Sequence, residues 1–152
     1  MTQASLFDES PTSDIDEIVV FSDGGSRGNP GPAAIGAVVL DPASEPPRRL
    51  ATVSECIGEA TSNVAEYRAL IAGLRAAEPF GARVVHVRAD SKLVIEQLSG
   101  RWKVKQDHLR PLVRDARALL ARYDVVDLQH VPREDNVDAD ALVNAALDAG
   151  GS

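Results

Sequence analysis

The sequence predicts an α/β domain built on a five-stranded mixed sheet, in which an antiparallel meander and two parallel strands are flanked by helices. Three short runs rich in β-branched residues come first, bounded by Gly and Pro. Two further runs of this kind follow, each preceded by apolar residues at helical spacing. The resulting order, βββαβααβα, favours a meander joined by helical crossovers to parallel strands. A chain of 152 residues, 44% of them hydrophobic, can bury the core that such a domain needs.

The three strands of the meander are expected over residues 18–23, 33–40 and 48–58. A glycine-rich turn, GGSRGNPGP, separates the first two strands, and a polar loop, DPASEPP, separates the second from the third. Gly and Pro in such segments end one strand and let the chain reverse into the next.

Periodicity and stop signals define the remaining elements. Apolar residues at positions 70, 71, 74 and 77 repeat at helical spacing, and Pro79 with Gly81 ends this helix. Gly100 ends the next helix, and Pro111 suits the first turn of a longer one. We expect a helix over 63–81, a strand over 84–90, helices over 91–100 and 107–123, a strand over 124–131 and a final helix over 136–149.

Charge divides the chain into a tail and a body. Of the 23 acidic and 16 basic residues, residues 1–17 hold five acidic ones and none that is basic. The body therefore has a net charge of −2, against −7 for the whole chain, and is not barred from binding phosphate. We expect a flexible acidic tail over 1–16, one domain over 17–149, and a C-terminal end or linker over 150–152.

Composition also indicates a compartment. The single cysteine, Cys56, excludes an internal disulfide and fits a reducing environment. The first 17 residues lack the basic start and apolar stretch of a signal peptide, and no apolar run is long enough to span a membrane. We therefore expect a cytoplasmic protein that acts as a monomer and has no membrane partner.

Four acidic residues stand out by position. Asp23 ends the first strand, Glu66 opens the first long helix, Asp90 ends the fourth strand, and Asp140 lies one turn into the last helix. The ends of neighbouring strands and the helices that leave them meet at one edge of an open sheet. Because crowded carboxylates repel one another unless cations neutralise them, this convergence favours a Mg²⁺ site.

Each of these acids also has an ordinary structural interpretation. Glu66 comes three residues after Asn63, so the pair could form a capping box. Asp90 could cap the helix that begins at the next residue, Asp23 could serve the glycine-rich turn, and Asp140 could be a solvated helix residue. Spacing alone does not decide between these interpretations and a metal site.

Four segments resemble the successive motifs of the type 1 ribonuclease H family, in its prokaryotic form that lacks a basic protrusion. They read FSDGGSRGNPGPAAIGAVV, TSNVAEYRALIAGL, VRADSKLVIEQLSG and HVPREDNVDADALVNAAL, occur in the family's order, and extend from about residue 18 to about residue 148. The resemblance implies a ribonuclease H-like fold. It also implies an endonuclease that hydrolyses the RNA strand of RNA–DNA hybrids and leaves 5′-phosphate and 3′-hydroxyl ends.

The resemblance assigns catalytic roles to the four acids. Asp23 and Asp90 would anchor two Mg²⁺ ions, with Mn²⁺ as a substitute. Glu66 would ligate the ion near the 2′-hydroxyl, and Asp140 would hold the ion that activates water. In NVDAD the family's aspartate is the fourth residue after the asparagine, so Asp140 matches the motif and Asp138 does not.

The resemblance also implies a set of substrate-binding residues. Glycines of the turn let backbone amides approach a sugar–phosphate strand, and polar residues nearby would read the 2′-hydroxyls that distinguish RNA from DNA. A lysine-rich helical protrusion of many bacterial members is missing, and the segment RWKVKQDH stands in its place. In this segment Trp102 could contact substrate or belong to the core. The candidates are Gly24, Gly25, Ser26, Arg27, Asn29, Ser62, Asn63, Ser91, Trp102 and Lys103.

An auxiliary catalytic group has two candidates. His130 matches by count the mobile histidine that helps product release in many members, but it directly follows the DVVDLQ strand without a glycine-rich loop. Some members instead use an arginine about seven residues before the last aspartate, and Arg133 has this spacing. We favour Arg133 as the auxiliary group and His130 as the strand end.

The N-terminal tail carries a separate motif. Residues 3–7 read QASLF and resemble the short peptide by which bacterial replication and repair proteins bind the sliding clamp. Gln3, Leu6 and Phe7 would make the contacts, because two apolar anchors on a polar tail have no place in the core. Tethering of this kind would raise the local concentration of the protein near DNA.

Three alternatives remain for the whole chain. One lobe of an actin-like or sugar-kinase ATPase shares this order of elements, although such proteins need two lobes. A non-catalytic module that binds RNA–DNA hybrids would be expected to have lost at least one of the four acids. The chain could also be the nuclease part of a larger protein, since its last residues, DAGGS, suit a linker.

Overall fold

The sheet has five strands, as the sequence predicts. The structure is a computed structural model that describes residues 15–150. The strand order is β4-β3-β2-β5-β6; β4, β3 and β2 pair antiparallel, and β2, β5 and β6 pair parallel. The strands are β2 (Glu17–Ser26), β3 (Gly31–Asp41), β4 (Arg48–Ala60), β5 (Val84–Ala89) and β6 (Val125–His130).

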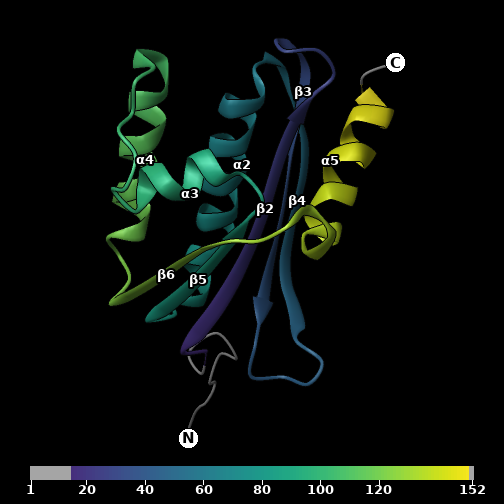
Figure 1. Cartoon of the computed structure of the whole chain (residues 1–152). Coiled ribbons are helices and arrows are strands. Elements are labelled where there is room, and N and C mark those ends of the chain that lie inside the picture. The colour runs from purple at the N-terminus through teal and green to yellow at the C-terminus, as the bar shows by residue number, and fades with distance from the viewer. Residues whose placement is uncertain (1–14, 151–152) are drawn as a thin grey trace, which may run out of the picture.

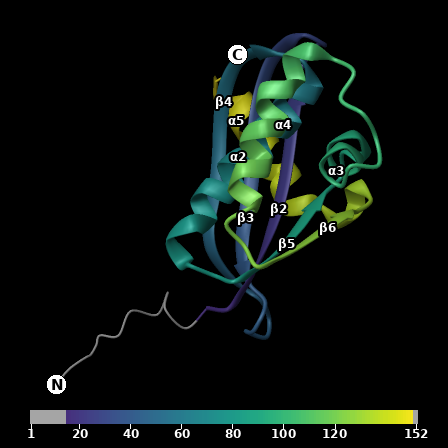
Figure 2. The ribbon, with the colours of Figure 1, turned by 90° about the vertical axis from the view of Figure 1, so that its left-hand side faces the viewer.

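Helices cover both faces of this sheet. Three of them lie on one face and the fourth, α5, lies on the other, against β3 and β4 (Figures 1 and 2). The helices are α2 (Ser62–Ala77), α3 (Lys92–Leu98), α4 (Arg110–Leu120) and α5 (Val137–Gly150), and the short 3₁₀ turns are η2 (Glu78–Phe80), η3 (Asp107–Leu109) and η4 (Arg133–Asp135).

The main core lies between the sheet and the three helices on its first face. Alternate residues of β2, including Ile18 and Val20, point into this core, because successive side chains of a strand face opposite sides. Tyr67 of α2 is fully buried there, and its hydroxyl donates to Oε1 of Gln97 at 2.6 Å. Because β2 lies between β3 and β5, it is hydrogen-bonded along both edges, and its position in the sheet is fixed from both sides.

Helix α5 packs on the second face through small residues. A Cβ on Gly36 of β3 would lie 2.4 Å from the backbone oxygen of Ala139, so the glycine permits a close approach of helix and strand. A second, smaller core forms beside this contact from Ala34, Val143, Ala146 and Leu147. Gly36 pairs with Asp23 across the sheet, and α5 is therefore held directly over the strand position that carries this acid.

The folded body extends slightly beyond its expected bounds. Ile15 is 8% exposed and belongs to the main core, and the backbone oxygen of Asp16 accepts from the amides of Arg83 and Val84. Ile15 and Asp16, which fall within the segment 1–16 expected as a tail, are thus held to the start of β5 by an apolar side chain and a bridging carbonyl. At the other end, α5 continues through Gly150, one residue past the expected domain limit.

Within residues 15–150, no helix combines the length and the apolar character that crossing a membrane requires.

One polar network joins three strands near their N-terminal ends. His86 of β5 contacts Asp127 of β6 at 2.9 Å through Nδ1 and Glu17 of β2 at 2.7 Å through Nε2. Arg88 also donates to Asp127, at 2.8 Å. The hydrogen bonds to Asp127 and Glu17 raise the pKa of His86 above its ordinary value of 6.5, because they favour the imidazolium.

This network predicts a pH-dependent stability. Because the pKa of His86 is raised in the folded state, its contribution is fully present below pH 6.5 and is lost as pH rises through the folded pKa. The difference in unfolding free energy between the wild type and His86→Gln should therefore be larger at pH 6 than at pH 9. Urea denaturation at both values measures it, and an equal difference at both would show that the imidazolium contributes nothing.

Candidate active site

Three of the predicted carboxylates meet in the structure. Asp23 lies on β2, Glu66 on α2 and Asp90 directly after β5. One oxygen from each lies within 4.8 Å of the others. Asp140 lies in the first turn of α5 and is close enough to Asp23 to raise the pKa of that acid. All four acids line a single cavity of about 500 Å³.

The backbone contact between β2 and α2 orients Glu66. A Cβ on Gly24 would lie 2.2 Å from the backbone of Ala65, so only glycine allows the strand and the helix to touch here. The Gly24 amide then donates to Oε1 of Glu66 at 3.2 Å. Thr61, whose hydroxyl accepts from the amide of Val64 at 3.3 Å, is the residue that caps α2. The capping-box interpretation of Glu66 is therefore wrong.

Asp90 is also free of a capping role. Ser91 is the N-cap of α3, and its hydroxyl accepts from the amide of Val94 at 3.3 Å. Because the neighbouring serine satisfies the helix end, the Asp90 carboxylate can face Asp23. The alternative in which Asp90 caps this helix is wrong.

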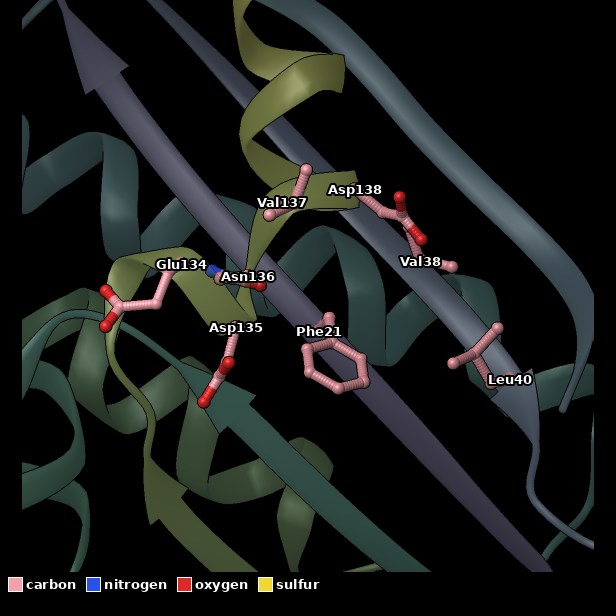
Figure 3. A pocket seen from close by; sticks show the side chains of 8 residues that line it. All are labelled: Phe21, Val38, Leu40, Glu134, Asp135, Asn136, Val137 and Asp138. Atoms are coloured by element: carbon pink, nitrogen blue, oxygen red, sulfur yellow. The ribbon is translucent and has the colours of Figure 1, made fainter. Parts of the chain in front are cut away.

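The last helix separates its two aspartates onto different surfaces. The Asp140 carboxylate accepts from Arg133 and from Asn144, each at 3.4 Å, and lines the cavity of the four acids. Asp138 pairs instead with Arg49 of β4 at 3.2 Å. It borders a different hollow, drawn in Figure 3, which lies over the exposed part of the sheet. The structure thus places Asp140, and not Asp138, beside Asp23.

Burial and mutual repulsion perturb the acids strongly. Burial raises the pKa of Asp23 to about 8, with the charge of Asp90 and the nearby Asp140 acting in the same direction. Burial, followed by the charges of Asp23 and Asp90, also raises the pKa of Glu66 well above its ordinary value. Arg133 opposes both shifts only partly. A compact set of oxygen donors that resists ionisation without a cation suits a hard divalent ion such as Mg²⁺.

The glycine-rich turn and the start of α2 form one wall of this cavity. Oδ1 of Asn29 accepts from the amide of Ser62 at 3.0 Å, and the hydroxyls of Ser26 and Ser62 lie 3.4 Å apart. Arg27 reaches across to Asp148 of α5 and pairs with it at 2.6 Å. The predicted residues that line the cavity are Gly24, Gly25, Ser26, Arg27 and Ser62.

The remaining substrate candidates lie elsewhere. Asn63, Trp102 and Lys103 border a second groove of about 510 Å³. Trp102 is 43% exposed, so it does not belong to the core. Nε2 of Gln97 donates to the backbone oxygen of Lys103 at 3.3 Å and holds this segment against α3. Ser91 lines neither the cavity nor the groove, and its hydroxyl serves the cap of α3.

Both auxiliary candidates border the cavity. His130 is the last residue of β6, as expected, and Arg133 lies in η4 with its side chain 78% exposed and within reach of Asp140. Asn144 was missed by the sequence reasoning, although its position one helical turn after Asp140 places it on the same face of α5.

The candidate clamp motif, with Gln3, Leu6 and Phe7, lies outside the described residues.

Comparison with known proteins identifies the family. A family model described as reverse transcriptase-like matches residues 21–146. The crystal structure of ribonuclease H1 from Halobacterium salinarum superimposes with a TM-score of 0.83 and 45% sequence identity, over 88% of this chain and 99% of that one. The chain belongs to the type 1 ribonuclease H family.

Two further relatives belong to this comparison. The N-terminal ribonuclease H domain of Rv2228c from Mycobacterium tuberculosis gives a TM-score of 0.82 and 50% identity, over 87% of this chain and 99% of that one. LC11-RNase H1, isolated from compost and crystallised with an RNA/DNA hybrid, gives 0.81 and 40%, over 89% and 99%. The whole bifunctional protein Rv2228c is 50% identical over 88% of this chain, but the chain spans only 36% of its length.

The crowded acids predict an unusual stability change. Asp90→Asn should leave the melting temperature of the metal-free protein unchanged or raise it, because one charge that repels Asp23 and Glu66 is removed. Added Mg²⁺ should raise the melting temperature of the wild type more than that of the variant. Thermal denaturation in EDTA and in Mg²⁺ measures both effects. A clearly lower melting temperature of the variant in EDTA would argue against repulsion in this cluster.

Proposed function

We propose that this protein is an endonuclease that hydrolyses the RNA strand of RNA–DNA hybrids with divalent metal and leaves 5′-phosphate and 3′-hydroxyl ends. The observation that carries the proposal is the convergence of Asp23, Glu66, Asp90 and Asp140 on one cavity, beside a turn suited to a sugar–phosphate strand. The hybrid bound by LC11-RNase H1, a relative with the same fold, supports the substrate class.

Two Mg²⁺ ions would be held by the four acids. Asp23, the most buried of them at 6% exposure, and Asp90 would anchor the ions, and Glu66 and Asp140 would supply further ligands. When bound, such ions activate water and stabilise the leaving oxygen of a phosphodiester. The protein contributes the fixed placement of the carboxylates and a polar rim in which Arg133 offsets part of the negative charge.

The RNA strand would lie along the wall formed by the glycine-rich turn and the start of α2. Ser26 and Ser62 present two adjacent hydroxyls there, which can donate to and accept from a 2′-hydroxyl. Arg27 supplies a cation at the same rim for a phosphate. DNA lacks the 2′-hydroxyl, so this wall would favour RNA at the cleaved strand.

The DNA strand would occupy the groove beside α3. Trp102 offers an exposed ring for a sugar or base, and Arg101, Lys103 and Lys105 line the same groove with positive charge. This basic segment takes the place of the missing protrusion. It also offsets, at the point of contact, the net negative charge of the chain.

The other functions named from the sequence have less support. A hybrid-binding module without catalysis has no need of four converging acids, and one lobe of an ATPase has no need of a second groove lined by tryptophan and cations. Binding to a sliding clamp through the tail, the monomeric state and the cytoplasmic location stay predictions.

The decisive experiment is cleavage of an end-labelled RNA–DNA hybrid. In Mg²⁺ the wild type should cut the RNA internally and leave the DNA intact, and in EDTA it should cut neither. Matched duplexes of RNA–RNA and DNA–DNA serve as controls. Absence of RNA cleavage in both Mg²⁺ and Mn²⁺ would contradict the proposal.

The two aspartates of α5 provide a matched pair. Asp140→Asn should lower kcat by more than about 100-fold, since even the outer partners of metal ligands are typically worth 10–100-fold. Asp138→Asn should change kcat less than about twofold, because Asp138 pairs with Arg49 away from the cavity and such surface pairs contribute little. The opposite ranking would move the metal site to the other face of α5.

The auxiliary group can be assigned by comparing two variants. Arg133→Ala should lower kcat about tenfold, because it removes the cation nearest Asp140, whereas His130→Ala should have a smaller effect. Steady-state kinetics with a fixed hybrid measures both. Loss of an inflection in the pH–rate profile of His130→Ala alone would instead identify the histidine as the titrating group.

A further inference from the structure

Asn136 is a buried polar residue that the proposed chemistry does not use. It is 1% exposed and lies between η4, which carries Arg133, and α5, which carries Asp140. Figure 3 shows it among the residues that line the hollow over the sheet, where the chain turns from Asp135 to Val137 above β2. Polar side chains that are buried this deeply are usually hydrogen-bonded.

The side chain of Asn136 is bonded to the central strand. Its Nδ2 donates to the backbone oxygen of Ser22 at 2.9 Å, across 114 residues of sequence. Ser22 and Ala89 form the last pair of the β2–β5 ladder, so β2 parts from its parallel neighbour at this point. Ser22 directly precedes Asp23, and the bond therefore fixes the strand at the residue before the most buried acid of the site.

The backbone of Asn136 is bonded to the other two elements of the site. Its amide donates to the oxygen of Arg133 at 2.9 Å, and its oxygen accepts from the amide of Asp140 at 3.1 Å. One residue thus links the strand of Asp23, the turn of Arg133 and the helix of Asp140. Each of the three links is a hydrogen bond of ordinary length.

Of the two polar atoms in the Asn136 side chain, only the donor Nδ2 forms a hydrogen bond. Oδ1 of Asn136 is buried and has no hydrogen-bond partner among the described residues, which is unfavourable in itself. Aspartate at this position would set a carboxylate against the Ser22 oxygen, and leucine of similar shape would have no donor. The donor is therefore the feature that the site uses.

We propose that Asn136 is a positioning residue that sets the Asp140 carboxylate against Asp23 and thereby completes the metal-binding set. This inference rests on the proposed metal-dependent function. Asp140 lies in the first turn of α5, and the small core under this helix lies further along it, at Val143, Ala146 and Leu147. The backbone of Ala139 in the same turn packs on Gly36 of β3, and the bond to Ser22 adds the tie to β2, the strand that carries Asp23. Without this bond the turn keeps its contact with β3, but the distance between the two acids is less closely fixed.

The test compares two variants with a matched control. Asn136→Ala and Asn136→Leu both remove the donor, and the second also preserves the volume. Ser54→Ala is the control, because the Ser54 hydroxyl donates to the oxygen of Leu142 at 2.7 Å and joins β4 to α5 away from the acids. We would measure Mg²⁺ binding to the metal-free protein by calorimetry, hybrid binding in EDTA, and kcat with KM.

The expected result separates positioning from stability. Both Asn136 variants should bind Mg²⁺ and turn over about 10–100-fold less well than the wild type, as is usual for partners that orient metal ligands. Hybrid binding in EDTA should stay within about twofold, a factor corresponding to less than about 0.5 kcal/mol. Ser54→Ala should change neither Mg²⁺ binding nor kcat, even where it lowers the melting temperature.

Two outcomes would overturn the inference. A folded Asn136→Leu protein with the Mg²⁺ affinity and kcat of the wild type would show that the bond does not set the site. Loss of folding in both variants would make Asn136 a determinant of the whole fold rather than of the metal set. If the wild type binds Mg²⁺ but cleaves no hybrid, the proposed function fails, and Mg²⁺ binding by the variants still decides the role of Asn136.

Discussion

Repulsion among buried carboxylates is the constraint on which the arrangement of this domain depends. Asp23, Glu66 and Asp90 hold oxygens within 4.8 Å of one another, and burial makes their ionisation still less favourable. Such a set persists only if the surrounding fold is rigid enough to hold it. The scaffold meets this demand by placing Asp23 on the central strand, where β3, β5 and α2 all pack against it.

Close backbone contacts transmit that rigidity to the other acids. The absence of a side chain at Gly24 lets α2 touch β2, and the absence of one at Gly36 lets α5 touch β3. Each glycine therefore sets the distance from a strand of the sheet to a helix that carries an acid. A divalent cation held by these acids would replace repulsion by attraction and would thereby stabilise the folded state.

The sequence was sufficient for the sheet, its strand directions and the identity of the acids. Runs of β-branched residues and helical periodicity carry the information on the elements, and the resemblance of NVDAD to the family's motif selects Asp140 over Asp138. It was not sufficient for contacts between distant residues. Thr61 and Ser91 cap the two helices, and this leaves Glu66 and Asp90 without a capping role. The sequence alone does not show which of several adjacent polar residues faces a helix end. The hydrogen bond from Asn136 to Ser22 joins residues 114 positions apart, and no repeating pattern in the sequence indicates it.

The placement of α5 has a consequence for how the domain loses its structure. Its apolar support is the small cluster of Ala34 with three residues of the helix, whereas α2, α3 and α4 share the large core. Segments with little buried apolar contact open at a lower free energy than the domain as a whole. Local opening of α5 would carry Asp140 away while β2, α2 and β5 stay folded with the other three acids. Amide hydrogen exchange would then be faster in α5 than in β2, and inactivation on heating would precede the loss of the sheet.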